Sequence, residues 1–331
     1  MTKKLPVMEV PLEDGKHALR RIKRDGILDP DREVTPIGGK LLIPVTKGGN
    51  GYSDKLPIKN RVPSPYENIV AHVDIPKKLI PLLPTRWERI GKVLLLKLAP
   101  ELLPYKGIIG RCYAKNIGMD TVALQGDILG RTRKPEIEII YGTETETVHL
   151  ENDVEFKLDV AKIMFSSGNI DERIRMSKVD TDGEIVIDMF AGIGYFSLPM
   201  AVHGTPERIY SLEINPVAHG YLQENCRINN VENVVKPVLG DNRDFSCEEP
   251  ADRVVMGYLH DTWKYLYKAF EFLNDEGIIH YHTLVKEGEI EVGLREQLAD
   301  CGIDDFSILK LKNIKSYAPH VYHVVADVKI G

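Results

Sequence analysis

The stretch EIVIDMFAGIG at residues 184–194 decides the fold of this chain. Its opening residues are rich in Ile and Val, which predicts a short buried strand that ends at Asp188. Glycines at 192 and 194 follow in a tight turn, and an apolar helical pattern covers 195–203. Strand, glycine turn and helix in this order make the first half of a nucleotide-binding βαβ unit. Glycine at such a turn lets the backbone approach a ligand closely.

Two further strand ends strengthen this prediction. Residues 208–213 form an expected second strand ending in Glu213, and an expected third strand over 234–239 ends just before Asp241 and Asn242. A carboxylate at the second tip can accept both hydroxyls of a ribose, and an acid–amide pair can read the edge of adenine. Each residue alone is more commonly a solvated strand end. Together, these residues at successive strand ends around one glycine turn predict an S-adenosylmethionine site of the class I methyltransferase fold.

The pattern around this stretch alternates strands with helices. We therefore expect an α/β, Rossmann-like fold, with a mainly parallel sheet, helices on both faces and smaller mixed α/β units before it. Further strands are expected at 90–98, 108–113, 253–258, 277–283, 306–311 and 321–328, and helices at 15–24, 262–273 and 287–299.

Length and charge suggest how the chain is divided. Its 331 residues suffice for two or three compact units. We expect a small basic unit at 1–60, a mixed α/β unit at 61–165 and the catalytic domain at 166–331. Residues 1–140 hold 25 Lys and Arg against 16 Asp and Glu, a net of +9, whereas the remainder holds 18 against 33, a net of −15. This asymmetry favours a basic front region that docks a polyanion, although two solvated faces would look the same.

Composition excludes several classes of protein. A hydrophobic content of 43% and a charged content of 28% are typical of a globular protein. No apolar run approaches the roughly 18 residues of a membrane span, and the first residues lack an apolar signal core, so we expect a cytoplasmic protein. The four cysteines lack Cys-x-x-Cys spacing, and His280 and His282 make only two candidate ligands, so no metal is expected.

Four motifs together resemble one family. They are DMFAGIG at 188–194, EINP at 213–216, GDNRD at 240–244 and DRVVM at 252–256. They are similar to those of the tRNA guanine-N1 methyltransferase group and its wybutosine-synthesis relatives. The similarity extends back through 165–176 and, more loosely, to about residue 66. The resemblance implies a tRNA substrate, with 61–165 as the docking unit.

One motif separates the members of this group. Its methyltransferases continue the fourth strand with Asn-Leu-Pro or Asn-Pro-Pro, whereas this chain has Met256-Gly257-Tyr258. In this respect it resembles the archaeal wybutosine aminocarboxypropyltransferases. Those enzymes move the 3-amino-3-carboxypropyl group of S-adenosylmethionine to carbon 7 of 4-demethylwyosine, at position 37 of phenylalanine tRNA, and release methylthioadenosine. The resemblance implies the same activity here.

The resemblance also implies a set of cofactor-binding residues. Arg173 would hold the methionine end, because a guanidinium fork suits a carboxylate. Glu213 would bind the ribose, and Asp241 with Asn242 the adenine. The whole expected set is Ser166, Arg173, Asp188, Gly192, Glu213, Asp241 and Asn242. No general base stands out, and His260 and Asp261 are candidates by position only.

Two alternatives stay open at this stage. The chain could be an S-adenosylmethionine-dependent tRNA guanine-N1 methyltransferase that acts at the same position, or a tRNA-binding protein that holds the cofactor without turnover. The by-product separates the first alternative from the aminocarboxypropyl transfer. We expect a monomer that contacts the anticodon region of phenylalanine tRNA.

Overall fold

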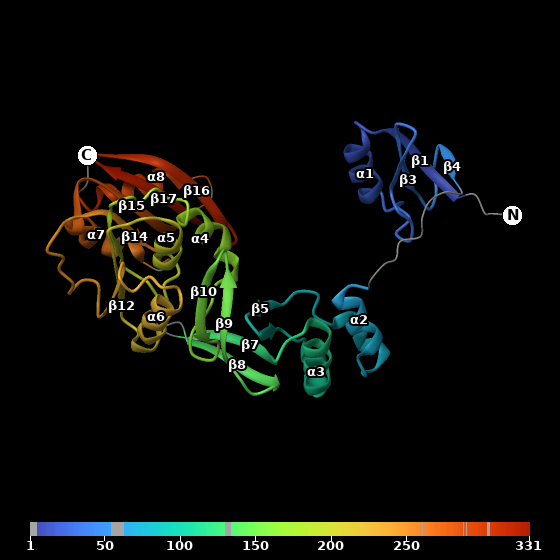
Figure 1. The fold of residues 1–331 in the computed structure, drawn as a ribbon, viewed down its shortest axis with the longest axis horizontal. Helices are drawn as coiled ribbons and strands as arrows, with labels where there is room; N and C mark the ends of the chain where they lie inside the picture. Colours follow the sequence, from blue (N-terminus) through green and yellow to red (C-terminus); the bar gives the residue numbers. More distant parts are fainter. Residues whose placement is uncertain are drawn as a thin grey trace. The chain divides into compact units, whose positions relative to one another are not determined.

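The computed structural model describes residues 5–53, 63–129, 134–259, 261–286, 288, 290–302 and 305–331. The chain divides into two compact units, Met1–Asn68 and Ile69–Gly331, and each is described by itself (Figure 1). The boundaries expected at residues 60 and 165 stay predictions. No helix among the described residues is long and apolar enough to cross a membrane.

The first unit is a small sheet covered by one basic helix. The sheet has the order β2-β3-β1-β4, and α1 follows β1. Ala18 and Ile22 of α1 pack on Ile43 and Val45, while the basic residues on its other side are exposed, as the sequence predicts. The bounds are β1 Leu5–Pro11, α1 Gly15–Arg24, β2 Thr35–Ile37, β3 Lys40–Pro44 and β4 Gly51–Ser53.

The second unit begins with a four-stranded sheet in the order β5-β6-β7-β8. The prediction of a strand at 108–113 is wrong, because these residues lie in helix α3. Ile109 and Tyr113 are buried four residues apart, and Gly118 ends the helix with a left-handed φ of 77°. The bounds are α2 Pro65–His72, η1 Lys77–Leu82, β5 Glu88–Ile90, β6 Val93–Leu96, η2 Pro100–Tyr105, α3 Lys106–Ile117, β7 Thr121–Leu129 and β8 Lys134–Tyr141.

A hairpin and a short helix lead into the large sheet. The hairpin β9–β10 lies against α6, because Asn225 on that helix and Asn229, which caps it, accept hydrogen bonds from the β10 backbone at 2.8 and 2.9 Å. Phe156 on β10 enters the core beside Phe165. The bounds are β9 Glu146–Glu151, β10 Val154–Asp159, η3 Ser167–Asn169 and α4 Ile170–Met176.

The rest of the second unit is built on a seven-stranded sheet in the order β13-β12-β11-β14-β15-β17-β16. The first five strands are parallel, and β17 is antiparallel to both its neighbours. The bounds are β11 Ile185–Asp188, α5 Ser197–His203, β12 Arg208–Glu213, α6 Pro216–Ile228, β13 Val235–Leu239, β14 Ala251–Met256, η4 Thr262–Tyr265, α7 Leu266–Phe272, β15 Leu273–Lys286, α8 Ile290–Ala299, β16 Phe306–Ala318 and β17 Val321–Ile330.

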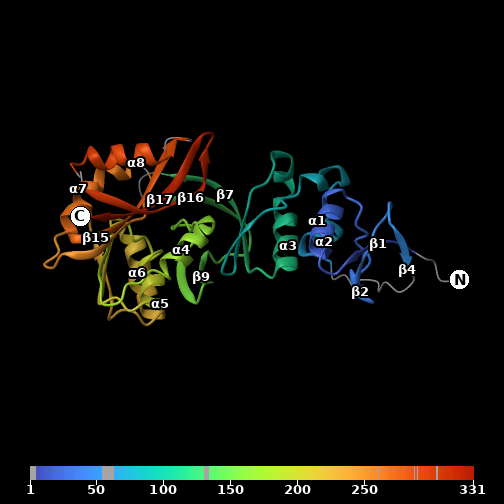
Figure 2. The same ribbon diagram turned by 90° about the horizontal axis from the view of Figure 1, so that it is seen from above.

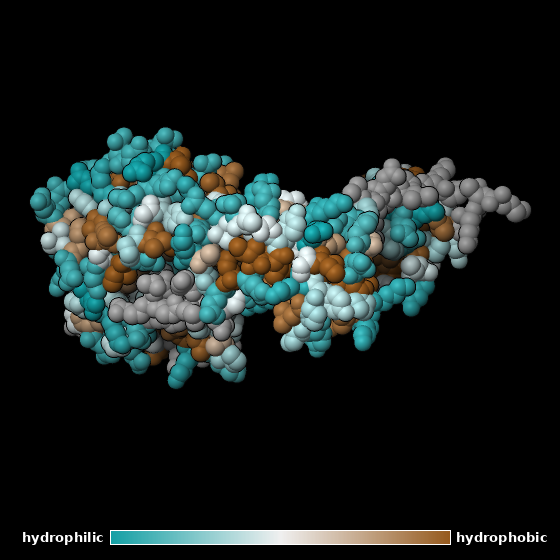
Figure 3. Space-filling model, turned by 90° about the horizontal axis from the view of Figure 1, so that it is seen from below, coloured by the Kyte–Doolittle hydropathy of each residue, from teal (hydrophilic) through white to brown (hydrophobic). Residues whose placement is uncertain are grey.

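Helices cover both faces of this sheet, which confirms the expected fold class. Successive side chains of a strand point to opposite faces, and β11 shows this clearly. Val186 packs in the core on the side of α5 and α6, whereas Ile187 packs in the core on the side of α7 and α8. Figure 2 shows the two helical layers with the sheet between them. In Figure 3, hydrophilic residues cover most of the visible face, with separate hydrophobic clusters among them.

In the glycine turn after β11, the structure leaves no space for a side chain at Gly194, and this can be tested by mutation. Gly194 has a φ of 100°, and a Cβ there would lie 2.5 Å from Leu198 Cγ. We expect Gly194→Ala to lower the free energy of unfolding by about 1–3 kcal/mol, measured by urea titration. The matched control is Gly220→Ala on the exposed side of α6, where nothing lies within 4 Å of the new methyl group. It should stabilise the protein by roughly 0.5–1 kcal/mol. Equal effects at both sites would contradict this account.

Candidate active site

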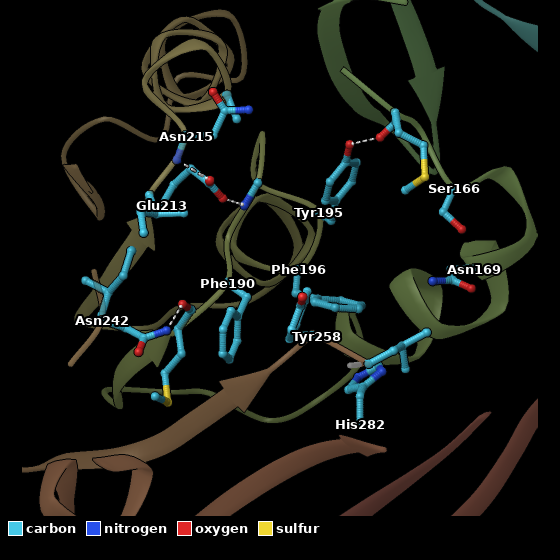
Figure 4. A pocket seen from close by; sticks show the side chains of 18 of the residues that line it. Ser166, Asn169, Phe190, Tyr195, Phe196, Glu213, Asn215, Asn242, Tyr258 and His282 are labelled. Carbon is cyan, nitrogen blue, oxygen red and sulfur yellow. Dashed lines mark hydrogen bonds between the residues drawn. The ribbon is translucent and has the colours of Figure 1, made fainter. Parts of the chain in front are cut away.

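A cavity of about 380 Å³ lies at the carboxyl ends of the parallel strands. Its walls come from the loops after β11, β12, β13 and β14, from η3 and α4, and from β15 and β17. The strand order reverses between β11 and β14, and ligands of open α/β sheets bind at such a point. Figure 4 shows Glu213 and Asn242 on one side of the cavity, and Ser166 and Asn169 on the other.

Glu213 is held by two backbone donors. Its Oε2 accepts a hydrogen bond from the Gly192 amide at 2.8 Å, and its Oε1 accepts one from the Asn215 amide at 2.7 Å. Burial raises the pKa of Glu213, and these backbone hydrogen bonds oppose the rise. Each carboxylate oxygen keeps a further lone pair, so the fixed carboxylate suits two ribose hydroxyls. Gly192 and Glu213 thus lie together in the cavity wall, where the sequence predicts them.

Asn242 carries an acceptor without a partner. Its amide donates to Met189 O at 2.9 Å, while its buried Oδ1 meets no hydrogen-bond partner among the described residues. Asp241 also lines the cavity, but its carboxylate pairs with both Nε and Nη2 of Arg243, at 2.9 and 2.5 Å. An unsatisfied buried acceptor favours a ligand with an N–H donor, such as the exocyclic amine of adenine. The geometry therefore favours Asn242 over Asp241 as the acceptor for adenine.

Asp188 is fully buried and is not among the residues that line the cavity, so its expected contact with the cofactor stays a prediction. Its Oδ2 accepts from Ser197 Oγ, which accepts in turn from Ser211 Oγ, both at 2.7 Å. Its Oδ1 accepts from the Phe190 amide at 3.3 Å. The side chain is fully buried, and burial raises its pKa to about 6. Asp188 therefore stabilises the glycine turn after β11 through these hydrogen bonds.

The opposite side of the cavity holds Ser166 and Arg173. Arg173 is only 2% exposed, and its Nη1 donates to Ser166 O at 2.9 Å. Its Nε and Nη2 pair with the two carboxylate oxygens of Glu151, at 2.5 and 2.8 Å. The Nε/Nη2 edge of the guanidinium is thus already paired with Glu151. Only the remaining N–H groups of Arg173 could hold the carboxylate of a ligand. No local pattern in the sequence indicates Glu151 as the partner, because it lies 22 residues from Arg173.

Aromatic side chains and histidines complete the walls. Phe190 stacks on Tyr258 with ring centroids 5.2 Å apart, and Phe196 packs beside His282 at the same separation. A Cβ on Gly257 would lie 2.6 Å from the Phe196 ring, which explains glycine in the Met-Gly-Tyr motif. Phe190, Phe196 and His282 are site residues that sequence reasoning missed. Tyr258 was indicated only as part of the Met256-Gly257-Tyr258 motif, without a role of its own.

The two weak catalytic candidates gain no support. His260 lies outside the described residues. Asp261 is 64% exposed and pairs with Lys264 at 2.8 Å, and it is not among the residues that line the cavity. Within the described ranges, no cluster of His, Cys, Asp and Glu could hold a metal ion.

Comparison with known proteins places this geometry in a family. The profile of the TRM5/TYW2 methyltransferase domain matches residues 147–299, and that of the TYW2 N-terminal domain matches 66–145. The tRNA(Phe) (4-demethylwyosine(37)-C(7)) aminocarboxypropyltransferase of Pyrococcus horikoshii is 46% identical, over 78% of this chain and 93% of its own length. The chain belongs to the TRM5/TYW2 family. The resemblance found in the sequence motifs is thereby confirmed.

Two further family members bear on the site. The tRNA (guanine(37)-N(1))-methyltransferase Trm5b of Pyrococcus abyssi is 36% identical over 98% of both chains. The crystal structure of P. horikoshii TYW2 in complex with MeSAdo superposes with a TM-score of 0.72 at 43% identity, over 80% of this chain and 97% of that one. The fold around the cavity is therefore that of a protein that binds methylthioadenosine.

The ribose assignment can be tested at Glu213. In Glu213→Gln, a side-chain amide would face the Gly192 and Asn215 donors, and the ribose would lose a charged acceptor. We expect the affinity for S-adenosylmethionine to fall about ten- to a hundred-fold, measured by calorimetry. Glu207→Gln, just before the opposite end of β12, is the matched control and should bind normally. Unchanged affinity in Glu213→Gln would remove Glu213 from the site.

The buried Asp188 predicts a pH effect on stability. Its folded pKa lies above the usual aspartate value of 3.8, so between about pH 4 and pH 6 its carboxyl group binds more protons in the folded state than in the unfolded state. The contribution of Asp188 to stability should therefore fall as the pH rises through this window. Asp188→Asn removes this titration. The difference in unfolding free energy, variant minus wild type, should increase by roughly 2–2.5 kcal/mol from pH 4 to pH 7. A difference that does not change with pH would contradict the raised pKa.

Proposed function

We propose that this chain transfers the 3-amino-3-carboxypropyl group of S-adenosylmethionine to carbon 7 of 4-demethylwyosine at position 37 of phenylalanine tRNA. The by-product is methylthioadenosine. The observation that carries this proposal is the cavity wall formed by Gly257 and Tyr258, which follow Met256 at the end of β14, with Glu213 and Asn242 in the same cavity. The 46% identical relative with this activity supports it.

The chemistry requires positioning more than acid–base help. The sulfonium of S-adenosylmethionine activates three carbons, and the carbon that faces the nucleophile reacts. In the proposed transfer, carbon 7 of the base bonds to the γ-carbon of the methionine part. The bond from that carbon to sulfur breaks, and its electron pair stays on the sulfur. The proton on carbon 7 then leaves, which restores the aromatic ring. Arg173 would hold the carboxylate of the transferred group.

One observation keeps the methyltransferase alternative in view. The aminocarboxypropyltransferase relative covers 78% of this chain, whereas the Trm5b methyltransferase covers 98%, including the first unit. The first unit therefore has a counterpart in the methyltransferase. A tRNA-binding protein without turnover is the third possibility, and any product formation excludes it.

We also propose that the protein acts in the cytoplasm as a monomer, and that it consists of three units with boundaries near residues 60 and 165.

The product separates the two enzymatic alternatives. We would incubate the protein and demethylwyosine-bearing tRNA with S-adenosylmethionine labelled either in its methyl group or in its carboxypropyl carbons. Carboxypropyl label should enter the tRNA, and methyl label should remain in methylthioadenosine. Unmodified guanosine at position 37 should not react. Methyl label in the tRNA, with release of adenosylhomocysteine, would establish the methyltransferase instead.

The basic first unit predicts a salt-dependent contribution to tRNA binding. Arg20 and Arg21 are exposed on α1, opposite the packed face. We expect Arg20→Glu to weaken tRNA binding and to reduce the slope of log affinity against log salt by about 0.7–0.9 if one phosphate contact is lost. Cofactor affinity should not change. Arg295→Glu on the exposed side of α8 is the control. Equal slopes for wild type and Arg20→Glu would argue against docking through α1.

A further inference from the structure

Glu151 is the last residue of β9 and lies under the wall of the cavity. It is only 8% exposed, and both of its carboxylate oxygens bond to Arg173. The two residues form a side-on bidentate pair, with Nε to Oε1 at 2.5 Å and Nη2 to Oε2 at 2.8 Å. This planar, two-point contact fixes the guanidinium in direction as well as in position.

Two more contacts complete the fixation of Arg173. Its Nη1 donates to Ser166 O at 2.9 Å, and its Cζ lies 4.7 Å from the centroid of the Phe165 ring. Each Nη atom carries two N–H bonds, and each makes one hydrogen bond in the part of the chain that the structure describes. Because Nε and one N–H bond of Nη2 form the side-on edge with Glu151, the second N–H bond of Nη2 lies on the end-on edge of the fork. Arg173 lines the cavity, so this edge is the one left for a ligand.

Glu151 is itself supported from the neighbouring sheet. His149 lies on the same face of β9, with Nε2 3.8 Å from Glu151 Oε2, and its Nδ1 accepts from the Gly91 amide at 3.2 Å. Gly91 sits in the turn between β5 and β6 with a φ of 54°, where a Cβ would lie 2.2 Å from Thr147 Oγ1. Through His149, Glu151 is therefore connected to the turn between β5 and β6 of the four-stranded sheet.

Glu151 is ionised at neutral pH. Burial raises the pKa of Glu151, but the hydrogen bonds from Arg173 and the nearby His149 outweigh this effect and lower the pKa to about 2. A buried arginine without a counter-ion is strongly unfavourable, so pairing with Glu151 allows the guanidinium to remain in the wall. If the ion pair were only structural, this compensation of the buried charge would be its whole role. The remaining end-on edge, in a cavity for a zwitterionic ligand, points to an additional role.

We propose that Glu151 is a positioning residue, which presents the end-on edge of Arg173 to the carboxylate of the methionine part of S-adenosylmethionine. The inference rests on the proposed function only in taking S-adenosylmethionine as the ligand. A fixed carboxylate limits the paths of the chain that joins it to sulfur, and so orients the γ-carbon that would react. Glu151 never touches the ligand and acts through Arg173.

Comparison of two ligands tests this role. Glu151→Gln keeps the shape of the side chain but places an amide donor against the guanidinium. We expect the affinity for S-adenosylmethionine to fall about ten- to a hundred-fold. The affinity for methylthioadenosine should stay within about two-fold, because that molecule lacks the aminocarboxypropyl group. Glu151→Asp retains the charge and should recover part of the loss.

The matched control is Glu146→Gln on the same strand. Glu146 is half exposed and pairs with Lys157 at 3.1 Å, away from the residues that line the cavity. Both ligands should bind it as they bind wild type. Equal loss of both ligands in Glu151→Gln, or no loss of either, would overturn the proposal. If Glu151→Gln melts too low to assay, the two-ligand ratio measured on Glu151→Asp decides in the same way.

This test is independent of the product. If the protein transferred a methyl group instead, the labelling experiment would show it, while the contrast between the two ligands would still report on Glu151. If the contrast fails but carboxypropyl label enters the tRNA, the proposed function stands and Glu151 is a structural counter-ion only.

Discussion

One hydrogen bond, from the backbone amide of Gly192 to the carboxylate of Glu213, joins the tips of β11 and β12. Gly192 has a φ of 58°, and a Cβ there would lie 2.6 Å from the Tyr195 ring, so glycine is required both for conformation and for space. The same turn directs α5 back along the sheet, where Ser197 meets the buried Asp188. The order acid, glycine, acid along the chain thus produces the end of the cavity that Gly192 and Glu213 line.

The local character of these contacts explains which predictions succeeded. The strands around β11 and the cavity-facing position of Glu213 follow from short apolar runs and strand ends, which are visible within ten residues. The strand expected at 108–113 failed because three successive apolar or small residues hid the four-residue spacing of Ile109 and Tyr113. The resemblance includes Asp188 in the cofactor set, but the sequence marks only the end of the strand and not the direction of its last side chain, which is hydrogen-bonded to Ser197.

The partners of α4 could not be predicted, because they are distant in sequence. Glu172 is fully buried and accepts from Arg175 at 2.6 Å and from Lys312 at 3.3 Å. Arg175 also bonds to Asp327 on β17, and hydrogen bonding to His280 and Arg175 keeps the pKa of Asp327 at about 2 despite burial. Buried charges are tolerated only when they are paired in this way. The network fastens α4 to the antiparallel end of the sheet, and α4 carries Arg173.

The two ends of the cavity therefore have different origins, and this bears on how one family supports two reactions. The nucleoside end depends on contacts within the glycine turn and at the adjacent strand tips. The other end depends on long-range pairs, such as Arg173 with Glu151, and on the loop after β14. Substitutions in that loop, or at the residues that hold Arg173, would change this end of the cavity without changing the contacts of Glu213 and Asn242 at the other end. Since the reacting carbon is chosen by orientation, a change of product requires no new catalytic group. Divergence between the 36% and 46% identical relatives is then expected to concentrate at the second end.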